Sequence, residues 1–242
     1  MNLSVSPAEP TAWQDAWFAA AAPLAMTVWR GVESQTDIAT ARLVDSPEEL
    51  DALEEMLEVS KPAKAAHSEG LHYLLFTPFR YTSGRDSRFR AANAPGVWYG
   101  ADTIQTACAE VAYWRYRFIL DSAGLAKNDG ELVSRHTLFR ASVKGAAIDL
   151  PSPPWNASDP RWTDPQDYSA TQALAREARR RGVEWIRYSS VRQPGAVCAA
   201  VLEPVALSHT KPSHLQDWIC RATRSRVWFT CRQSAQSYSW DF

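Results

Sequence analysis

Residues 97–115 decide how this chain should fold, and they read Val97-Trp98-Tyr99-Gly100-Ala101-Asp102-Thr103-Ile104-Gln105-Thr106-Ala107-Cys108-Ala109-Glu110-Val111-Ala112-Tyr113-Trp114-Arg115. The first three residues are typical of a buried strand that ends in an aromatic residue. Asp102 is expected to cap the helix that follows, with Gln105 as its capping-box partner three positions on. A strand that leads directly into a helix therefore forms the centre of the expected fold.

One face of this helix carries a carboxylate among small and aromatic side chains. Residues three and four apart share a helix face, and this spacing groups Ala107, Glu110, Tyr113, Trp114 and Arg117. Burying a charged carboxylate is costly unless the carboxylate is paired or used. Two explanations follow: Arg115 or Arg117 neutralises Glu110 as a structural ion pair, or Glu110 faces a site.

The composition indicates a globular protein with a sizeable core. The chain has 242 residues and is 45% hydrophobic, which fits one large domain or one domain with an added subdomain, and we expect a single domain over residues 1–242. Its net charge of -1 argues against direct binding of nucleic acid. The longest apolar stretch, residues 17–26, contains Pro23 and is too short to span a bilayer, so we expect a cytoplasmic protein outside the membrane. The spacing of the 4 cysteines and 5 histidines predicts neither a metal site nor a disulfide framework.

Several other segments have the patterns of regular structure. Helices are expected at residues 11–22, at 47–59 with Ser46 as N-cap, and at 170–181 with Ser169 and Gln172 as a capping box and Gly182 as the stop. Strands are expected at 24–30, 71–76, 183–188, 196–202 and 227–231, and a hairpin at 138–143 and 146–150 with its turn at Lys144-Gly145. Residues 207–224 fit no single element. Strands separated by a few helices indicate an α+β fold.

The polar residues suit an anionic ligand that contains a flat ring. No dinucleotide fingerprint, P-loop, nucleophile elbow or H-E-x-x-H motif is present. Arg30 ends an expected strand, and Arg88 lies in an arginine-rich loop at residues 77–95. The guanidinium groups of both residues can hold phosphate. Ser169 begins a helix whose amides can bind phosphate, while Tyr99 can flank a heterocycle. Glu110 can stabilise an oxocarbenium-like sugar.

Each of these residues also has a purely structural explanation. Arg30 and the loop arginines fit exposed charges, Tyr99 fits a core position, and Ser169 fits a plain N-cap that stabilises its helix by about 1 kcal/mol. Taken one at a time, they predict only an α+β domain with an anion site. Taken together, they suit a ligand with a pyrophosphate, a ribose and a planar leaving base.

The order of these residues resembles the RES domain family, bacterial toxins of type II toxin–antitoxin pairs whose fold is similar to that of ADP-ribosyltransferases. The matching stretches, within residues 24–205, are Val28-Trp29-Arg30, Ser87-Arg88-Phe89, Trp98-Tyr99-Gly100 through Thr106-Ala107 to Ala109-Glu110, Tyr168-Ser169 with Gln172-Ala173, and Tyr188-Ser189-Ser190-Val191-Arg192. The chain departs from the family pattern at Gly31, where many members have an aromatic residue, and at Ser87 and Phe89, where the family has glycine and tryptophan.

The resemblance implies an enzyme that degrades NAD as its substrate, with no cofactor, by cleaving the nicotinamide–ribose bond. Glu110, Arg30 and Ser169 are then the catalytic residues, and Arg88, Tyr99 and Ser190 bind NAD, with Ser190 as the alternative functional serine. The resemblance also implies a helix-turn-helix, Xre-like antitoxin as partner and a toxin homodimer. The acceptor stays open among water, phosphate and a protein side chain.

Two other functions stay open beside the NAD-degrading enzyme. The first is a mono-ADP-ribosyltransferase that modifies a specific protein target. The second is a nucleotide- or partner-binding module in which Arg30, Arg88 and Ser169 hold phosphate and nothing is cleaved.

Overall fold

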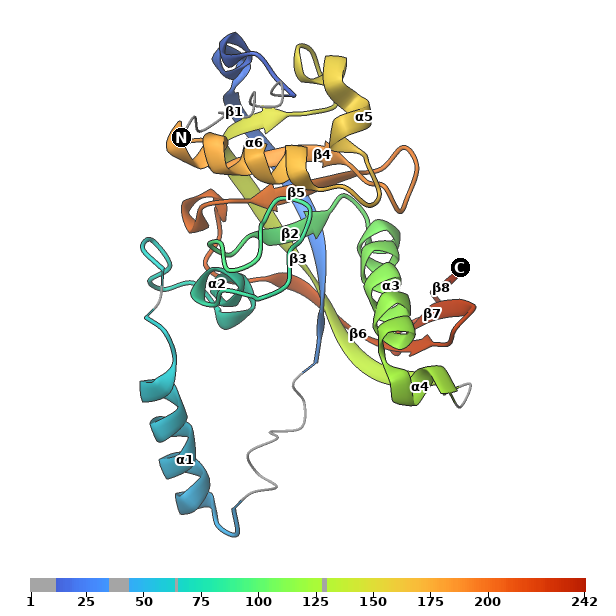
Figure 1. Cartoon of the computed structure of the whole chain (residues 1–242). Coiled ribbons are helices and arrows are strands. Elements are labelled where there is room, and N and C mark those ends of the chain that lie inside the picture. Colours follow the sequence, from blue (N-terminus) through green and yellow to red (C-terminus); the bar gives the residue numbers. More distant parts are fainter. Residues whose placement is uncertain (1–11, 35–43, 64, 128–129) are drawn as a thin grey trace, which may run out of the picture.

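The computed structural model describes residues 12–34, 44–63, 65–127 and 130–242 (Figure 1). Its helices are η1 (Asp15–Ala20), α1 (Pro47–Ser60), α2 (Tyr73–Arg80), α3 (Ile104–Asp121), α4 (Ala123–Lys127), η3 (Trp155–Ser158), α5 (Asp159–Trp162), α6 (Ser169–Arg180) and η4 (Pro204–Ala206). Its strands are β1 (Ala22–Glu33), β2 (Trp98–Ala101), β3 (Leu132–Asp149), β4 (Trp185–Ser189), β5 (Val197–Val201), β6 (Ser213–Ala222), β7 (Arg226–Cys231) and β8 (Ser237–Asp241). None of the helices in the described residues has the length and apolar character needed to cross a membrane.

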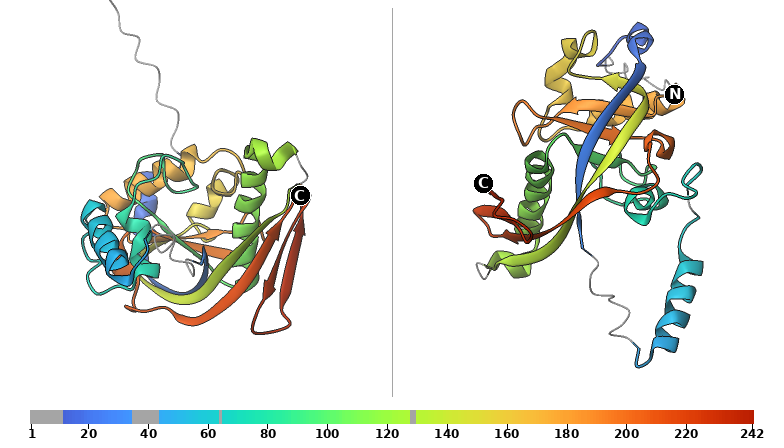
Figure 2. Two further views of the ribbon diagram at one scale, coloured as in Figure 1. Left: turned by 90° about the horizontal axis from the view of Figure 1, so that it is seen from below. Right: turned by 180° about the vertical axis from the view of Figure 1, so that it is seen from behind.

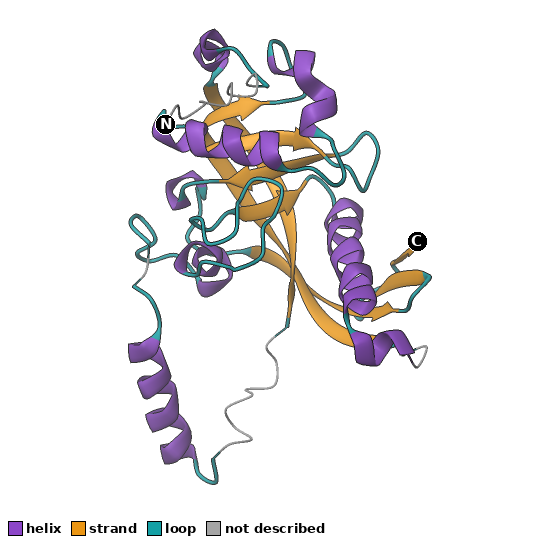
Figure 3. Cartoon of the chain, viewed as in Figure 1, coloured by secondary structure: helices purple, strands orange, loops and turns teal. Residues whose placement is uncertain are grey.

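In the described residues, a mostly antiparallel sheet of 8 strands in the order β1-β2-β5-β4-β3-β6-β7-β8 forms the centre of the molecule. One edge of the long strand β3 pairs with β1, from Ala22↔Ala147 to Glu33↔His136. Its other edge pairs with β6 and, near its end, in parallel with β4. Because β1 also meets β2 at Trp29↔Ala101, strands β1, β3, β4, β5 and β2 close into a ring. Helices and a mixed sheet in one structure confirm the α+β fold class (Figure 3).

Two hydrophobic cores lie on opposite faces of this sheet, because successive side chains of a strand point to opposite sides. In β3, Leu138 belongs to one core and the neighbouring Phe139 to the other. In β4, Ile186 and Trp185 divide in the same way. Helices α3 and α6 supply residues to the first core, and α2 supplies residues to the second. The sheet is therefore buried on both sides near β2, β4 and β5.

The C-terminal strands brace the helix that carries Glu110. Helix α3 contacts β6, β7 and β8 as well as β1 and β2, and these strands run beside it in both the front and rear views (Figures 1 and 2). The ring of Phe242 stacks on Tyr116 of α3 with centroids 4.5 Å apart. In contrast, α1 extends away from the body of the fold.

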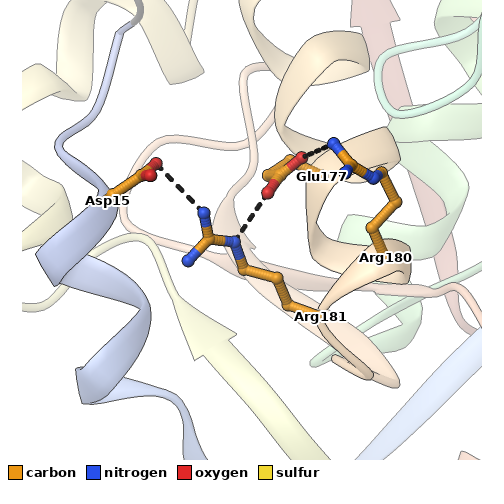
Figure 4. Close-up of polar contacts among 4 residues, drawn as sticks. All are labelled: Asp15, Glu177, Arg180 and Arg181. Carbon is orange, nitrogen blue, oxygen red and sulfur yellow. Dashed lines mark hydrogen bonds and ion pairs between the residues drawn. The ribbon is translucent and has the colours of Figure 1, made fainter.

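The N-terminal turn η1 is attached to the end of α6. Arg181 lies between Asp15 of η1 and Glu177 of α6, at 3.1 and 2.6 Å (Figure 4). The Asp15 side chain is 81% exposed, so this ion pair contributes little stability. Apolar packing holds the turn instead, since Phe18 is buried and its ring lies 5.2 Å from that of Trp155.

Two expected elements are wrong: a predicted strand is a helix, and a predicted hairpin is one continuous strand. Residues 71–76 do not form a strand; α2 covers most of them, because Leu71, Leu75 and Phe79 recur every four residues and pack into one core. The predicted hairpin at Lys144-Gly145 does not exist, since β3 runs straight through and pairs with β1 there. Gly145 is needed for space rather than for a turn, because an added Cβ would lie 1.6 Å from the Glu184 carboxylate.

The helices at 47–59 and 170–181 and the strands at 24–30, 183–188, 196–202 and 227–231 are confirmed within a few residues, whereas the predicted helix at 11–22 is only the 3-10 turn η1. The ambiguous residues 207–224 contain strand β6. Of the three predicted N-cap residues, Ser46 is confirmed, since its hydroxyl accepts the Glu49 N–H at 3.2 Å, whereas Asp102 and Ser169 are wrong. Thr103 caps α3 by accepting the Thr106 N–H, and Asp102 bonds instead to the Val197 N–H of β5. The residue before α6 is Tyr168, with no side-chain cap.

Candidate active site

A cavity of about 220 Å³ opens where β1 and β2 separate beside α3. Its ionisable and aromatic lining residues are Arg30, Arg88, Glu110, Arg192, Trp29, Tyr99, Trp114, Tyr168 and Tyr188. Three guanidinium groups thus face one carboxylate among aromatic walls. Six site residues were predicted from the sequence, and four of them line this cavity: Arg30, Arg88, Tyr99 and Glu110.

Glu110 lies in α3, partly buried, and its carboxylate is held by neutral donors. The Ser190 hydroxyl donates to Glu110 Oε1 at 2.7 Å, and the Cys198 thiol lies 3.9 Å from the same oxygen. Burial raises the pKa of Glu110, while the Ser190 hydrogen bond and the nearby charges of Arg192 and Arg88 act in the opposite direction. These groups favour the ionised carboxylate that burial disfavours.

The structural ion-pair explanation for Glu110 fails. Arg115 pairs with Glu33 of β1, and Arg117 pairs with Asp121 at 3.8 Å. Across the part of the chain that the structure describes, no cation lies within ion-pair distance of Glu110. Glu110 therefore lines the cavity without an ion-pair partner among the described residues.

Ser190 is positioned to orient Glu110. It is buried directly after β4, and its oxygen accepts the backbone N–H groups of Arg192 and Gln193 at 3.2 and 3.1 Å. Because these bonds occupy its acceptor side, the hydroxyl hydrogen is directed to Glu110. Ser169 lies at the start of α6 with an exposed side chain and does not line the cavity. Of the two predicted serines, Ser190 is the one that the fold brings to Glu110.

Arg30 is fixed at the gap between β1 and β2. Its Nη1 donates to the Tyr99 carbonyl at 2.7 Å, and its guanidinium carbon lies 5.1 Å from the Trp98 ring centroid. Burial lowers the pKa of Arg30 to about 10, which leaves the side chain protonated at neutral pH. Tyr99 is anchored too, since its hydroxyl accepts the Phe89 N–H at 3.1 Å and bonds Ser87 at 2.9 Å.

The turn at residues 87–90 is packed rather than solvated, contrary to the sequence expectation for this loop. Phe89 is 2% exposed, and the Gln172 side chain of α6 donates to the Ser87 carbonyl at 3.1 Å. Arg88 is buried; its Nη1 donates to the carbonyls of Trp162 and Asp164, both at 2.9 Å. The Arg88 guanidinium is therefore held in place at the cavity wall by backbone acceptors.

Arg192 is a cavity residue that the sequence prediction missed. Its guanidinium carbon lies 3.4 Å from the Tyr113 ring centroid, over α3, and it lowers the pKa of Glu110 by its charge. Arg192 follows Ser190 by two residues in a matched stretch, and that proximity was the available signal. Periodicity cannot mark an arginine in a loop as facing a distant helix.

The balance of charge on the cavity wall suits an anion with a flat ring. Three guanidinium groups exceed one carboxylate, and guanidinium binds phosphate oxygens in bidentate geometry. Aromatic side chains provide faces on which a heterocycle can stack. In the described residues, no group of three or more histidine, cysteine or acidic side chains is arranged to hold a metal ion.

Comparison with known proteins identifies a family and a similar solved structure. The chain matches the RES domain over residues 62–223. This range includes Arg88, Tyr99, Glu110, Ser169 and Ser190, but it begins after Arg30 and ends beyond the residue 205 expected from the resemblance. No curated protein matches the chain.

Among solved structures, the chain is similar to one described as the M. tuberculosis MbcT-MbcA toxin-antitoxin complex. The two are 14% identical, the alignment covers 93% of this chain and 91% of that chain, and the TM-score is 0.48. Because the RES domain match spans more than half of its residues, this chain belongs to the RES domain family.

Proposed function

We propose that this protein is the toxin of a toxin–antitoxin pair and degrades NAD by cleaving the bond between nicotinamide and ribose. The observation that carries the proposal is the Glu110 carboxylate, which faces an aromatic cavity with three arginines and is oriented by a serine. Membership of the RES domain family supports the same function, since the family resemblance implies NAD degradation.

In the proposed reaction, the C1′–N bond of the nicotinamide riboside breaks and its electron pair leaves with the nicotinamide nitrogen. The ribose C1′ becomes oxocarbenium-like, and the negative charge of Glu110 stabilises the positive charge that develops there. Water then adds to C1′ and releases a proton, or phosphate adds in its place. Either acceptor leaves an ADP-ribose product, so the protein is an NAD hydrolase or phosphorylase.

The remaining cavity residues bind and orient NAD in this proposal. Arg30 and Arg88 are fixed by backbone carbonyls, so little conformational entropy is lost when they bind the pyrophosphate. Tyr99 packs beside the nicotinamide ring. Ser190 holds the Glu110 carboxylate ionised and correctly aimed, whereas the catalytic role of Ser169 stays a prediction, tested by its alanine variant.

The antitoxin is proposed to bind over α3 at the cavity mouth. Trp114 and Phe118 are 50% and 41% exposed there, one turn apart on the helix. They line a groove of about 720 Å³ that shares Trp114 and Tyr168 with the cavity. Exposed apolar side chains in a groove often mark a protein interface. The family resemblance suggests a helix-turn-helix antitoxin, and a toxin homodimer.

Incubation of the purified chain with NAD tests the proposed reaction. Free nicotinamide should accumulate with ADP-ribose, or with its 1-phosphate when phosphate is supplied. Unchanged NAD after long incubation, with binding seen by calorimetry, would instead indicate a binding module. Radioactivity from labelled NAD on one protein band would indicate a mono-ADP-ribosyltransferase. Expression in bacteria with and without the neighbouring reading frame, while the cellular NAD pool is followed, tests the antitoxin.

A further inference from the structure

We propose that a second cavity, next to the candidate active site, binds the adenosine half of NAD; this inference rests on the proposed function. The second cavity has a volume of about 130 Å³. It lies between the C-terminal end of β1, helix α2 and Thr137 of β3. It shares one residue, Arg30, with the first cavity. Arg30 is therefore the wall between the two.

The volumes favour one ligand that spans both cavities. Pockets for drug-sized ligands begin at roughly 300 Å³. The first cavity, at about 220 Å³, falls short of that size, as does the second at about 130 Å³. Together they exceed it.

The order of chemical groups across the two cavities matches the order of groups in a dinucleotide. NAD has a ring and ribose at each end and two negatively charged phosphates between them. The protein has an aromatic cavity with Glu110, then the fixed cation Arg30, then the second cavity. Arg30 Nε is buried without a hydrogen-bond partner among the described residues. The positive charge of Arg30 lies at the junction of the two cavities, where the two phosphates of a dinucleotide need a cation.

The second cavity itself suits an uncharged nucleoside better than a phosphate. The Glu33 carboxylate at its edge is paired with Arg115. Tyr73 offers an aromatic face: it is 53% exposed and lies 4.5 Å from the His72 ring. The Thr77 hydroxyl donates to the Tyr73 carbonyl at 2.6 Å, so its oxygen still accepts a hydrogen bond. A purine amino group is a donor of that kind.

Two further hydroxyls of this cavity suit a ribose. Ser34 and Thr137 lie 2.8 Å apart and share one hydrogen bond, so each oxygen retains acceptor capacity for a sugar hydroxyl. The groove over α3 is a poorer place for the adenosine. At about 720 Å³ it is too wide to enclose one base, and it mixes Arg85 and Arg117 with Asp86 and Asp121.

Steady-state kinetics with NAD and with nicotinamide mononucleotide, which lacks the adenosine half, test the assignment in the full chain. In Tyr73→Ala, the KM for NAD should rise about 5- to 100-fold, the range expected for one lost base–aromatic stack, while kcat stays unchanged because the lost contact is the same in ground and transition states. The KM for the mononucleotide should match that of the unaltered chain. Tyr73→Phe should restore the KM for NAD, since the aromatic face is retained.

Two matched controls make the test specific. Tyr81→Ala removes another exposed tyrosine, at the end of α2, which lines neither cavity, and should leave both KM values unchanged. Phe118→Ala tests the groove over α3. A rise in the KM for NAD in Phe118→Ala but not in Tyr73→Ala would overturn the assignment, as would an equal rise for both substrates in Tyr73→Ala.

Binding of ADP-ribose, measured by calorimetry, separates failure of this inference from failure of the proposed function. If the unaltered chain cleaves neither substrate yet binds ADP-ribose, and Tyr73→Ala binds it about 5- to 100-fold more weakly, the cavity assignment stands and the NAD-cleaving function is wrong. Equal binding by both chains, or no binding, refutes the cavity assignment.

Discussion

Replacement of Glu110 by glutamine keeps the shape of the side chain and removes its charge, so it isolates the electrostatic role proposed for this residue. The reacting ribose carbon would carry a developing positive charge. Two unit charges about 4 Å apart interact by roughly 4 kcal/mol at an effective dielectric constant of about 20. Each 1.36 kcal/mol or so corresponds to a factor of about ten in rate, so Glu110→Gln should lower kcat for nicotinamide release about a thousand-fold.

The same variant should lose activity without losing stability. Burial raises the pKa of Glu110 in the folded protein above its unfolded value. The ionised carboxylate therefore costs folding free energy at neutral pH, and this cost disappears as the pH falls below the unfolded pKa, where both states are protonated. Glu110→Gln should thus have a Tm equal to or above that of the unaltered chain at pH 7, with the difference shrinking toward acid pH.

Nicotinamide release followed by chromatography and Tm followed by scanning calorimetry, across pH 4 to 8, measure both effects. Glu131→Gln is the matched control: this exposed glutamate pairs with Arg221, neither residue lines the first or the second cavity, and its loss should leave kcat unchanged. A Glu110→Gln variant that turns over NAD at the unaltered rate refutes the catalytic role. A variant that is inactive because its Tm has fallen refutes the stability argument.

Three smaller changes test the surrounding structure. Ser190→Ala removes the donor that lowers the pKa of Glu110, so the acid limb of the pH–rate profile should move to higher pH. The kcat of this variant should fall about 10- to 100-fold, the loss expected for a hydrogen bond to a charged group. In Ser169→Ala the altered side chain is exposed, and the pH–rate profile should stay in place. Gly182→Ala adds a Cβ at φ 74°, in open space, and should lower the free energy of unfolding by about 1–2 kcal/mol, seen as a lower urea midpoint with an unchanged m-value. Asp15→Ala breaks an exposed ion pair with Arg181, and a melting scan should show an unchanged Tm.

Much of the local structure could be predicted because it follows from short-range spacing. The strand-to-helix unit that carries Glu110 is present, as are α6 with its stop at Gly182 and the two buried strands that follow it. These elements are encoded by periodicity and by glycine at positive φ, both of which are properties of neighbouring residues. The residue type and helix face of Glu110 left two explanations open, an ion pair and a site, and the resemblance to the RES domain family favoured the second.

The errors arose where two local structures were both acceptable and distant residues chose between them. Lys144-Gly145 is a good turn by composition, yet β1 supplies partners along the whole of β3. Asp102 is a good N-cap by residue type, yet its carboxylate accepts the Val197 backbone N–H, and Thr103 caps α3 instead. In both cases a hydrogen bond to a partner far away in sequence replaced the local one.

The sequence by itself determined the types of the candidate site residues, the helix that carries the carboxylate and the shorter strands β2, β4, β5 and β7, because these depend on side-chain chemistry and local periodicity. Tertiary structure alone decided which groups meet: Ser190 reaches Glu110 across 80 residues, Arg192 stacks on α3, and Ser169 stays outside the cavity. The physical reason is that a hydrogen bond or an ion pair needs atoms within a few ångströms, and only the closed ring of strands brings these segments that close.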